Sequence, residues 1–95
     1  MRRYRLSGPA RADLRVVWKA IAHRSQARAD RFLDELAVRF QEIADRPRAP
    51  GSKDIMYDSG CRIHTVCEFV IFYRAQDDGA EIIRILEGLD DLRFW

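Results

Sequence analysis

Residues 62–86 read RIHTVCEFVIFYRAQDDGAEIIRIL, and they contain the strongest structural pattern in the chain. Residues 69–73 are five consecutive β-branched or aromatic residues, a run that is too short for a helix and apolar on both faces. Such a run is typical of a strand buried on both sides, in the middle of a sheet. The loop 75–80 contains Asp-Gly, and Gly79 can adopt the positive φ that a hairpin connection needs. The pattern therefore predicts a β-hairpin whose second strand is 81–86.

Two amphipathic helices are expected before this hairpin. The first begins near Pro9, because Ser7 or Gly8 can cap it and proline suits the first turn, where its missing N–H costs nothing. Apolar residues recur at i, i+3, i+4 and i+7 up to about His23, so one face of this helix is apolar. That face carries Leu14, Val17, Trp18 and Ile21. The outward face is expected to carry Arg11, Asp13, Arg15 and Lys19.

The second helix is expected to run from its cap at Ser25 to about Asp45. Pro47 ends it, because the residue before a proline is pushed out of the helical region. Only two or three residues separate the two helices, so they should fold back as an antiparallel hairpin. The apolar stripe of the second helix is Ala29, Phe32, Leu33, Leu36, Phe40, Ile43 and Ala44.

The predicted fold is α+β, with the order β-αα-β-β-β. Residues 4–6 form a short first strand, 47–54 a loop by composition, and 62–67 the first strand of a three-stranded meander. The helical hairpin then packs on one face of a mostly antiparallel four-stranded sheet. The first strand should lie at an edge of the meander, and the sequence leaves open which edge. A chain of 95 residues supports one core, so residues 1–95 are expected to form a single domain.

Composition indicates a cytoplasmic protein. Charged residues make up 34% of the chain and hydrophobic residues 47%, which is an ordinary mixture for a soluble globular protein. No apolar run approaches the ~20 residues that span a bilayer, so no membrane contact is expected. Arg2, Arg3 and Arg5 open the chain, but the apolar segment of a secretion signal does not follow them.

No metal, cofactor or catalytic site is expected. Cys61 and Cys67 would lie too far apart on one strand for a disulfide, and we interpret them as reduced structural thiols. Two thiols with only His23 and His64 as companions do not make a zinc site. The chain also has no phosphate-binding loop, no zinc-protease helix motif and no serine-hydrolase motif.

The net charge of +2 hides an asymmetry. Residues 1–48 carry twelve basic and six acidic side chains, a net charge of +6. Residues 49–95 carry five basic and nine acidic side chains, a net charge of −4. The basic half can attract nucleic acid or an acidic partner, or it can form a solvated helix face in which arginines alternate with acids.

Three arginines on neighbouring strands, Arg62, Arg74 and Arg84, are candidates for a charged site. If they converge on one exposed face of the sheet, they can bind phosphates or carboxylates through bidentate contacts. The alternative, which we favour, is that they form cross-strand ion pairs. The candidate partners in those pairs are Glu68, Glu81 and Glu87. His64 lies in the middle of a strand, where a satisfied or solvent-facing histidine is commoner than a catalytic one.

The last residues, 89–95, end in two large aromatic side chains, Phe94 and Trp95. They either close the open end of the core or present a surface to a partner. Large aromatic side chains in such a position commonly anchor interfaces. The complete set of candidate partner-binding residues is Arg62, Arg84, Leu89, Arg93, Phe94 and Trp95.

Six short segments mark most of the predicted elements. They are YRLS at 4–7, RADL at 11–14, ADRFLDEL at 29–36, GCR at 60–62, FVIFYR at 69–74 and IRIL at 83–86. In this order, and over essentially the whole chain, they resemble the ParE-type toxins of bacterial toxin–antitoxin modules, a branch of the RelE/ParE superfamily. The resemblance implies the β-αα-β-β-β architecture and a protein without catalytic residues.

The resemblance also implies a function and partners. ParE-type toxins typically poison DNA gyrase, and a cognate antitoxin masks them through an extended, partly disordered segment. We therefore expect a hetero-oligomer with an antitoxin, with DNA gyrase as the target. Contact with DNA is expected only through the antitoxin or gyrase.

Two alternatives remain open at this stage. One is a RelE-like endonuclease that cuts mRNA on the ribosome, using Arg62, Arg84 and His64. Cleavage of a phosphodiester needs a positive cluster and a placed proton donor, whereas Lys19 and Lys53 are the only lysines in the chain. The other alternative is a degenerate module that still binds an antitoxin but is no longer toxic.

Overall fold

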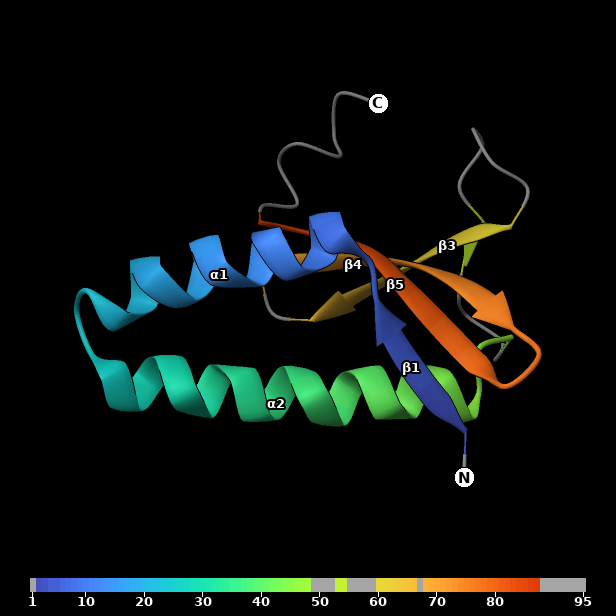
Figure 1. Cartoon of the computed structure of the whole chain (residues 1–95), viewed down its shortest axis with the longest axis horizontal. Helices are drawn as coiled ribbons and strands as arrows, with labels where there is room; N and C mark the ends of the chain where they lie inside the picture. The colour runs from blue at the N-terminus through green and yellow to red at the C-terminus, as the bar shows by residue number, and fades with distance from the viewer. Residues whose placement is uncertain (1, 49–52, 55–59, 67, 88–95) are drawn as a thin grey trace.

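The computed structural model describes residues 2–48, 53–54, 60–66 and 68–87, shown as the coloured ribbon in Figure 1. The two helices of this part are α1 (Gly8–Ala22) and α2 (Gln26–Asp45). Its strands are β1 (Arg3–Leu6), β2 (Lys53–Asp54), β3 (Cys61–Val66), β4 (Phe69–Gln76) and β5 (Gly79–Glu87). The order confirms the predicted α+β fold, because a helical hairpin follows the first strand and precedes a meander.

The strands form one mixed sheet in the order β1-β5-β4-β3-β2. The strand predicted to be central, β4, lies in the middle and pairs antiparallel with β3 and with β5. β1 pairs parallel with β5, which settles the edge that the sequence left open. The two-residue strand β2 pairs with β3 in a segment that we had predicted as a loop, so the described sheet has one strand more than the four predicted.

The hairpin between β4 and β5 is tighter than predicted. Gln76 pairs with Gly79, so only Asp77 and Asp78 form the connection, and Gly79 has the positive φ that was expected, 149°. A Cβ atom at Gly79 would collide with the carbonyl oxygen of Arg3 on the neighbouring strand β1. Glycine is therefore needed here for two reasons, the backbone angle and the close approach of β1.

The helix boundaries follow the predicted caps. Ser7 Oγ accepts a hydrogen bond from the Ala10 amide at 3.0 Å, and Ser25 Oγ accepts one from the Arg28 amide at 3.2 Å. Each bond satisfies a backbone donor that the first helical turn leaves without a partner. α2 ends at Asp45, and Arg46, the residue before Pro47, has already left the helical region with φ −140° and ψ 62°.

The hydrophobic core lies between the helical hairpin and one face of the sheet. Figure 1 shows α1 and α2 antiparallel and side by side. α2 contributes most of the fully buried helical side chains, whereas Ala10 is the only fully buried residue of α1. Aromatic pairs join the layers: Tyr4 with Phe40, whose ring centroids are 5.4 Å apart, and Phe32 with Phe69, at 4.9 Å. The largest fully buried side chains are Tyr73, Phe40, Leu36, Ile71, Ile82, Ile85 and Val70.

We expect Gly79→Ala to destabilise the protein strongly. Forcing alanine into this conformation costs about 1–3 kcal/mol, and displacing the β1 backbone adds to that cost. Thermal or denaturant unfolding measures the change. Gly8→Ala is the matched control, since a Cβ at Gly8 meets no atom within 4 Å, and its stability should be unchanged or slightly higher. Equal stability of the two variants would contradict the close approach of β1 to Gly79.

Candidate functional site

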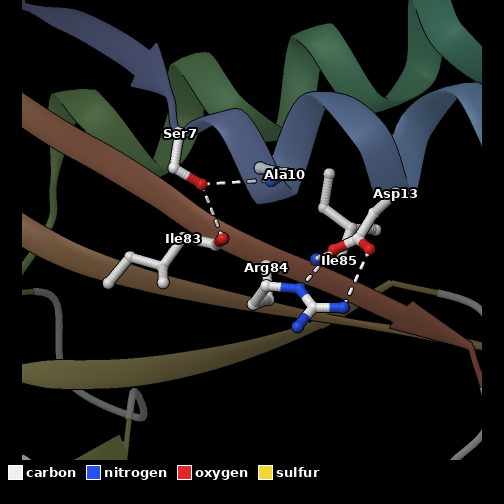
Figure 2. Close-up of polar contacts among 6 residues, drawn as sticks. All are labelled: Ser7, Ala10, Asp13, Ile83, Arg84 and Ile85. Carbon is white, nitrogen blue, oxygen red and sulfur yellow. Dashed lines mark hydrogen bonds and ion pairs between the residues drawn. The ribbon is translucent and has the colours of Figure 1, made fainter.

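The edge of β5 is closed by two different elements. β1 pairs with its first four residues, from Gly79 to Ile82, and the start of α1 takes over from there. The Ser7 amide donates to the Ile82 carbonyl oxygen at 2.9 Å, and Ser7 Oγ donates to the Ile83 carbonyl oxygen at 2.7 Å. Figure 2 shows this side chain between the helix that it caps and the strand. Ser7 therefore links α1 to β5 through its backbone amide and its hydroxyl group.

Asp13 continues the same edge, six residues after Ser7 along the chain. Its Oδ2 accepts from the Ile85 amide at 2.9 Å and from Arg84 Nε at 2.7 Å, while its Oδ1 accepts from Arg84 Nη2 at 2.9 Å (Figure 2). The Asp13 side chain is only 15% exposed. The prediction that Asp13 faces outward is therefore wrong, because the unpaired β5 amide and Arg84 draw this carboxylate onto the sheet.

The electrostatics of the pair follow from these contacts. Burial by itself raises the pKa of the Asp13 carboxyl, but hydrogen bonds from Arg84 and from the Ile85 amide, with the Arg84 charge, outweigh it. The pKa of Asp13 ends below its ordinary value. The hydrogen bond and the charge of Asp13 raise the pKa of Arg84 in turn. The bidentate pair is thus fully charged near neutral pH.

Arg62 and Arg84 do not converge on one exposed surface. Arg84 is bound to Asp13 of α1, whereas Arg62 lies opposite Tyr73 on the helix-facing side of β3 and donates to the Pro47 carbonyl oxygen at 3.4 Å. The central strand β4 separates the two strands that carry them. The cross-strand pairing that we favoured for Arg84 is also incorrect, since its partner is a helical aspartate.

His64 lies on the same helix-facing side as Arg62, opposite Ile71. Burial lowers the pKa of His64 and the positive charge of Arg39 lowers it further, while the Glu42 carboxylate offsets part of the effect. Arg39 and Glu42 belong to α2 and form an ion pair with each other at 3.1 Å. His64 is thus a half-buried residue beneath α2.

A groove opens between the helical hairpin and the end of the sheet where β5 finishes. Its volume is about 420 Å³. The lining comes from both helices, the turn between them and the ends of β4 and β5: Val17, Ala20, Ile21, Arg24, Arg28, Phe69 and Glu87. The basic character of Arg24 and Arg28 was visible in the sequence, but the groove was not, because strand residues complete it.

The outer edge of β1 is the second open feature of the described sheet. The amides of Arg3 and Ser7 donate to β5, and alternate residues of a strand direct their backbone groups to opposite sides. The amides of Tyr4 and Leu6 therefore point away from β5, at a place where the described residues supply no further strand. Such an edge can accept an extended segment of another chain.

Four candidate residues, Leu89, Arg93, Phe94 and Trp95, lie outside the described residues. Within the described ranges, Cys61 is buried, and no group of three or more His, Cys, Asp or Glu side chains is placed to hold a metal. Neither α1 nor α2 has the length and apolar character needed to cross a membrane.

Comparison with known protein families identifies the family of the chain. A family model described as the ParE toxin of the type II toxin–antitoxin system parDE matches residues 4–92 of the 95-residue chain. No curated protein matches the chain.

We expect Asp13→Ala to lower the free energy of unfolding by about 1–3 kcal/mol, because it leaves the Ile85 amide without its acceptor. The difference from the wild type should be constant above the ordinary aspartate pKa of about 3.9. It should shrink as the pH falls through the lowered pKa of Asp13, because protonation removes the charge that Arg84 binds. Denaturant unfolding across pH 2–7 (roughly the range over which carboxylates titrate) measures both effects.

Asp78→Ala is the control for the loss of a carboxylate. Asp78 binds Arg5 at 2.8 Å, but the two side chains are 52% and 60% exposed, so its loss should cost less than about 1 kcal/mol. If Asp13→Ala and Asp78→Ala were equally mild, the closure of the β5 edge would not depend on Asp13.

Proposed function

We propose that this chain, which belongs to the ParE toxin family of type II toxin–antitoxin systems, inhibits DNA gyrase by binding it. We also propose that a cognate antitoxin neutralises it. Membership of this family identifies the chain as a toxin of such a system. Beyond this membership, we propose the target, the mode of action and the contact with the antitoxin. With these partners, the proposed location of the protein is the cytoplasm.

The bidentate ion pair between Arg84 and Asp13 is the observation that best supports a toxin that acts by binding rather than by catalysis. Both oxygens of the carboxylate hold the guanidinium, which leaves it poorly placed to stabilise the developing charge of a cleaving phosphodiester. Arg62 is directed to the end of α2, and His64 lies half-buried beneath that helix. Arg84 is therefore separated from Arg62 and His64, so the three residues of the nuclease alternative do not form one site, which favours a toxin without a catalytic centre.

A toxin that acts without catalysis must bind one state of its target more tightly than another. We assign this contact to the segment 89–95, because it carries two large aromatic side chains next to a positive one, Arg93. The basic surface of the helical hairpin is the second candidate for this contact. DNA would be reached only through gyrase or through the antitoxin.

For the antitoxin we propose addition of an extended segment to the outer edge of β1. The outward amides of Tyr4 and Leu6 offer main-chain hydrogen bonds, and the neighbouring side chains of Arg3 and Arg5 are exposed and basic. A segment that is disordered alone gains these bonds as it folds onto the toxin. The complex is accordingly a hetero-oligomer of toxin and antitoxin.

In a supercoiling assay, we expect the purified toxin to inhibit DNA gyrase and the double variant Phe94→Ala/Trp95→Ala to lose inhibition. Truncating the aromatic anchors of an interface commonly costs 2 kcal/mol or more, roughly a thirtyfold loss of affinity. The melting temperature of each variant is measured in parallel, because the two aromatics would lower it if they closed the core.

Val38→Ala is the matched control, since Val38 is an apolar side chain on α2 with 57% exposure and should not affect inhibition or stability. A wild-type protein that leaves gyrase active, or that cuts mRNA on translating ribosomes, would overturn the proposed function. Inhibition that survives in the stably folded double variant would instead transfer the contact to the helical hairpin.

Hydrogen exchange tests the antitoxin contact. In the free toxin, the amides of Tyr4 and Leu6 should exchange faster than that of Ser7, which already donates to β5. Addition of the cognate antitoxin should slow exchange at Tyr4 and Leu6 at least tenfold and leave Ser7 nearly unchanged. Tight binding without protection of Tyr4 and Leu6 would exclude the β1 edge as the contact.

A further inference from the structure

The groove at the end of β5 combines an apolar floor with positive charge. Val17 and Ile21 of α1 and Phe69 of β4 form the apolar part, and Arg24 and Arg28 stand beside it. A volume of about 420 Å³ lies within the range of small-ligand sites, so it suits a few side chains rather than a whole helix. The groove therefore fits a short segment that has apolar and acidic side chains together.

Arg24 and Arg28 have no acidic partner among the described residues. Other guanidinium groups of this part pair with carboxylates, as in Arg84 with Asp13 and Arg5 with Asp78. Neither Arg24 nor Arg28 forms a side-chain hydrogen bond or an ion pair with any described residue. Both are exposed, and their guanidinium groups can each hold a carboxylate by two hydrogen bonds.

The chain itself supplies a segment of the required composition at this place. Glu87 is the last residue of β5, and it lines the groove. The sequence continues from it as Gly-Leu-Asp-Asp-Leu, so that Asp90 and Asp91 follow within four residues. Four residues extend at most about 14 Å, which keeps both aspartates near the groove that Glu87 borders.

We propose that the segment 88–92 of this chain occupies the groove. Leu89 and Leu92 lie on the apolar floor made by Val17, Ile21 and Phe69. Asp90 and Asp91 pair with Arg24 and Arg28. The occupant is intramolecular, because β5 ends at the groove and the residues that follow it carry apolar side chains for the floor and acidic side chains for Arg24 and Arg28.

This docking has a consequence for the aromatic residues that follow. With 88–92 held against the helical hairpin, Phe94 and Trp95 are presented from a fixed point of the surface. Preorganisation of this kind raises affinity by reducing the entropy lost on binding. The role of the docked segment in presenting these residues to gyrase rests on the proposed function, whereas the docking itself does not.

Nuclear Overhauser effects between methyl groups test the docking directly. In the full-length protein, the methyl groups of Leu89 and Leu92 should give contacts to those of Val17 and Ile21. Arg24→Glu/Arg28→Glu should abolish these contacts, because two acidic side chains would then face Asp90 and Asp91. Adding Asp90→Arg/Asp91→Arg to that variant should restore them.

Arg11→Glu/Arg15→Glu is the control with the same spacing and the same change of charge. Arg11 and Arg15 are exposed on α1 and do not line the groove, so the methyl contacts should persist in this variant. Absence of the contacts in the wild type, or their survival in Arg24→Glu/Arg28→Glu, would overturn the proposal. So would their equal loss in the Arg11→Glu/Arg15→Glu control.

Gyrase inhibition is measured on the same variants to separate the two proposals. We expect Arg24→Glu/Arg28→Glu to raise the concentration needed for half-inhibition at least tenfold, and the fourfold variant to recover most of the loss. If the methyl contacts follow the charges while no variant inhibits gyrase, the docking stands and the proposed target is wrong. If inhibition is present but the contacts are absent, the target stands and the docking is wrong.

Discussion

The fold depends on how the uncovered part of the β5 edge is satisfied. β1 pairs with four of the nine residues of β5, and the backbone groups beyond it need other partners because unpaired buried donors are costly. Ser7 and Asp13 supply them from the start of α1, so a serine hydroxyl and a carboxylate continue the role of a strand. The same bonds fix the position of α1 on the sheet, since they hold it at two points one to two turns apart.

This attachment also divides the charges of the protein into two groups. Arg84 is neutralised at the sheet by Asp13, the single acid of α1, and so contributes to the fold. Arg24 and Arg28, at the other end of the hairpin, have no such partner among the described residues. Positive charge is therefore available to a partner at the turn between the helices, whereas the guanidinium of Arg84 is not available on β5.

The groove is a further result of the same geometry. The first half of α1 is anchored over the middle of β5, and the second half of the helix extends past the end of that strand (Figure 1). Val17 and Ile21, which belong to this second half, are therefore only partly buried. α2, which carries the larger part of the helical core, closes the other side through Arg28. A binding surface thus arises where the two helices extend beyond the sheet, without any change to the buried core.

Local chemistry by itself determined the elements of this protein. The five-residue apolar run, the serine caps, Pro47 and Gly79 act through neighbouring residues, so the hairpin, both helices and their ends could be predicted from the sequence. The sequence could not predict the parallel pairing of β1 or the added strand β2. It also could not predict the partner of Asp13, the separation of Arg62 from Arg84, or the groove. Asp13 and Arg84 are 71 residues apart, and a periodic pattern places an acid on the polar face of a helix without showing what that face meets. Only the packing of the hairpin on the sheet brings an unpaired strand amide to that carboxylate, and this proximity decides its role.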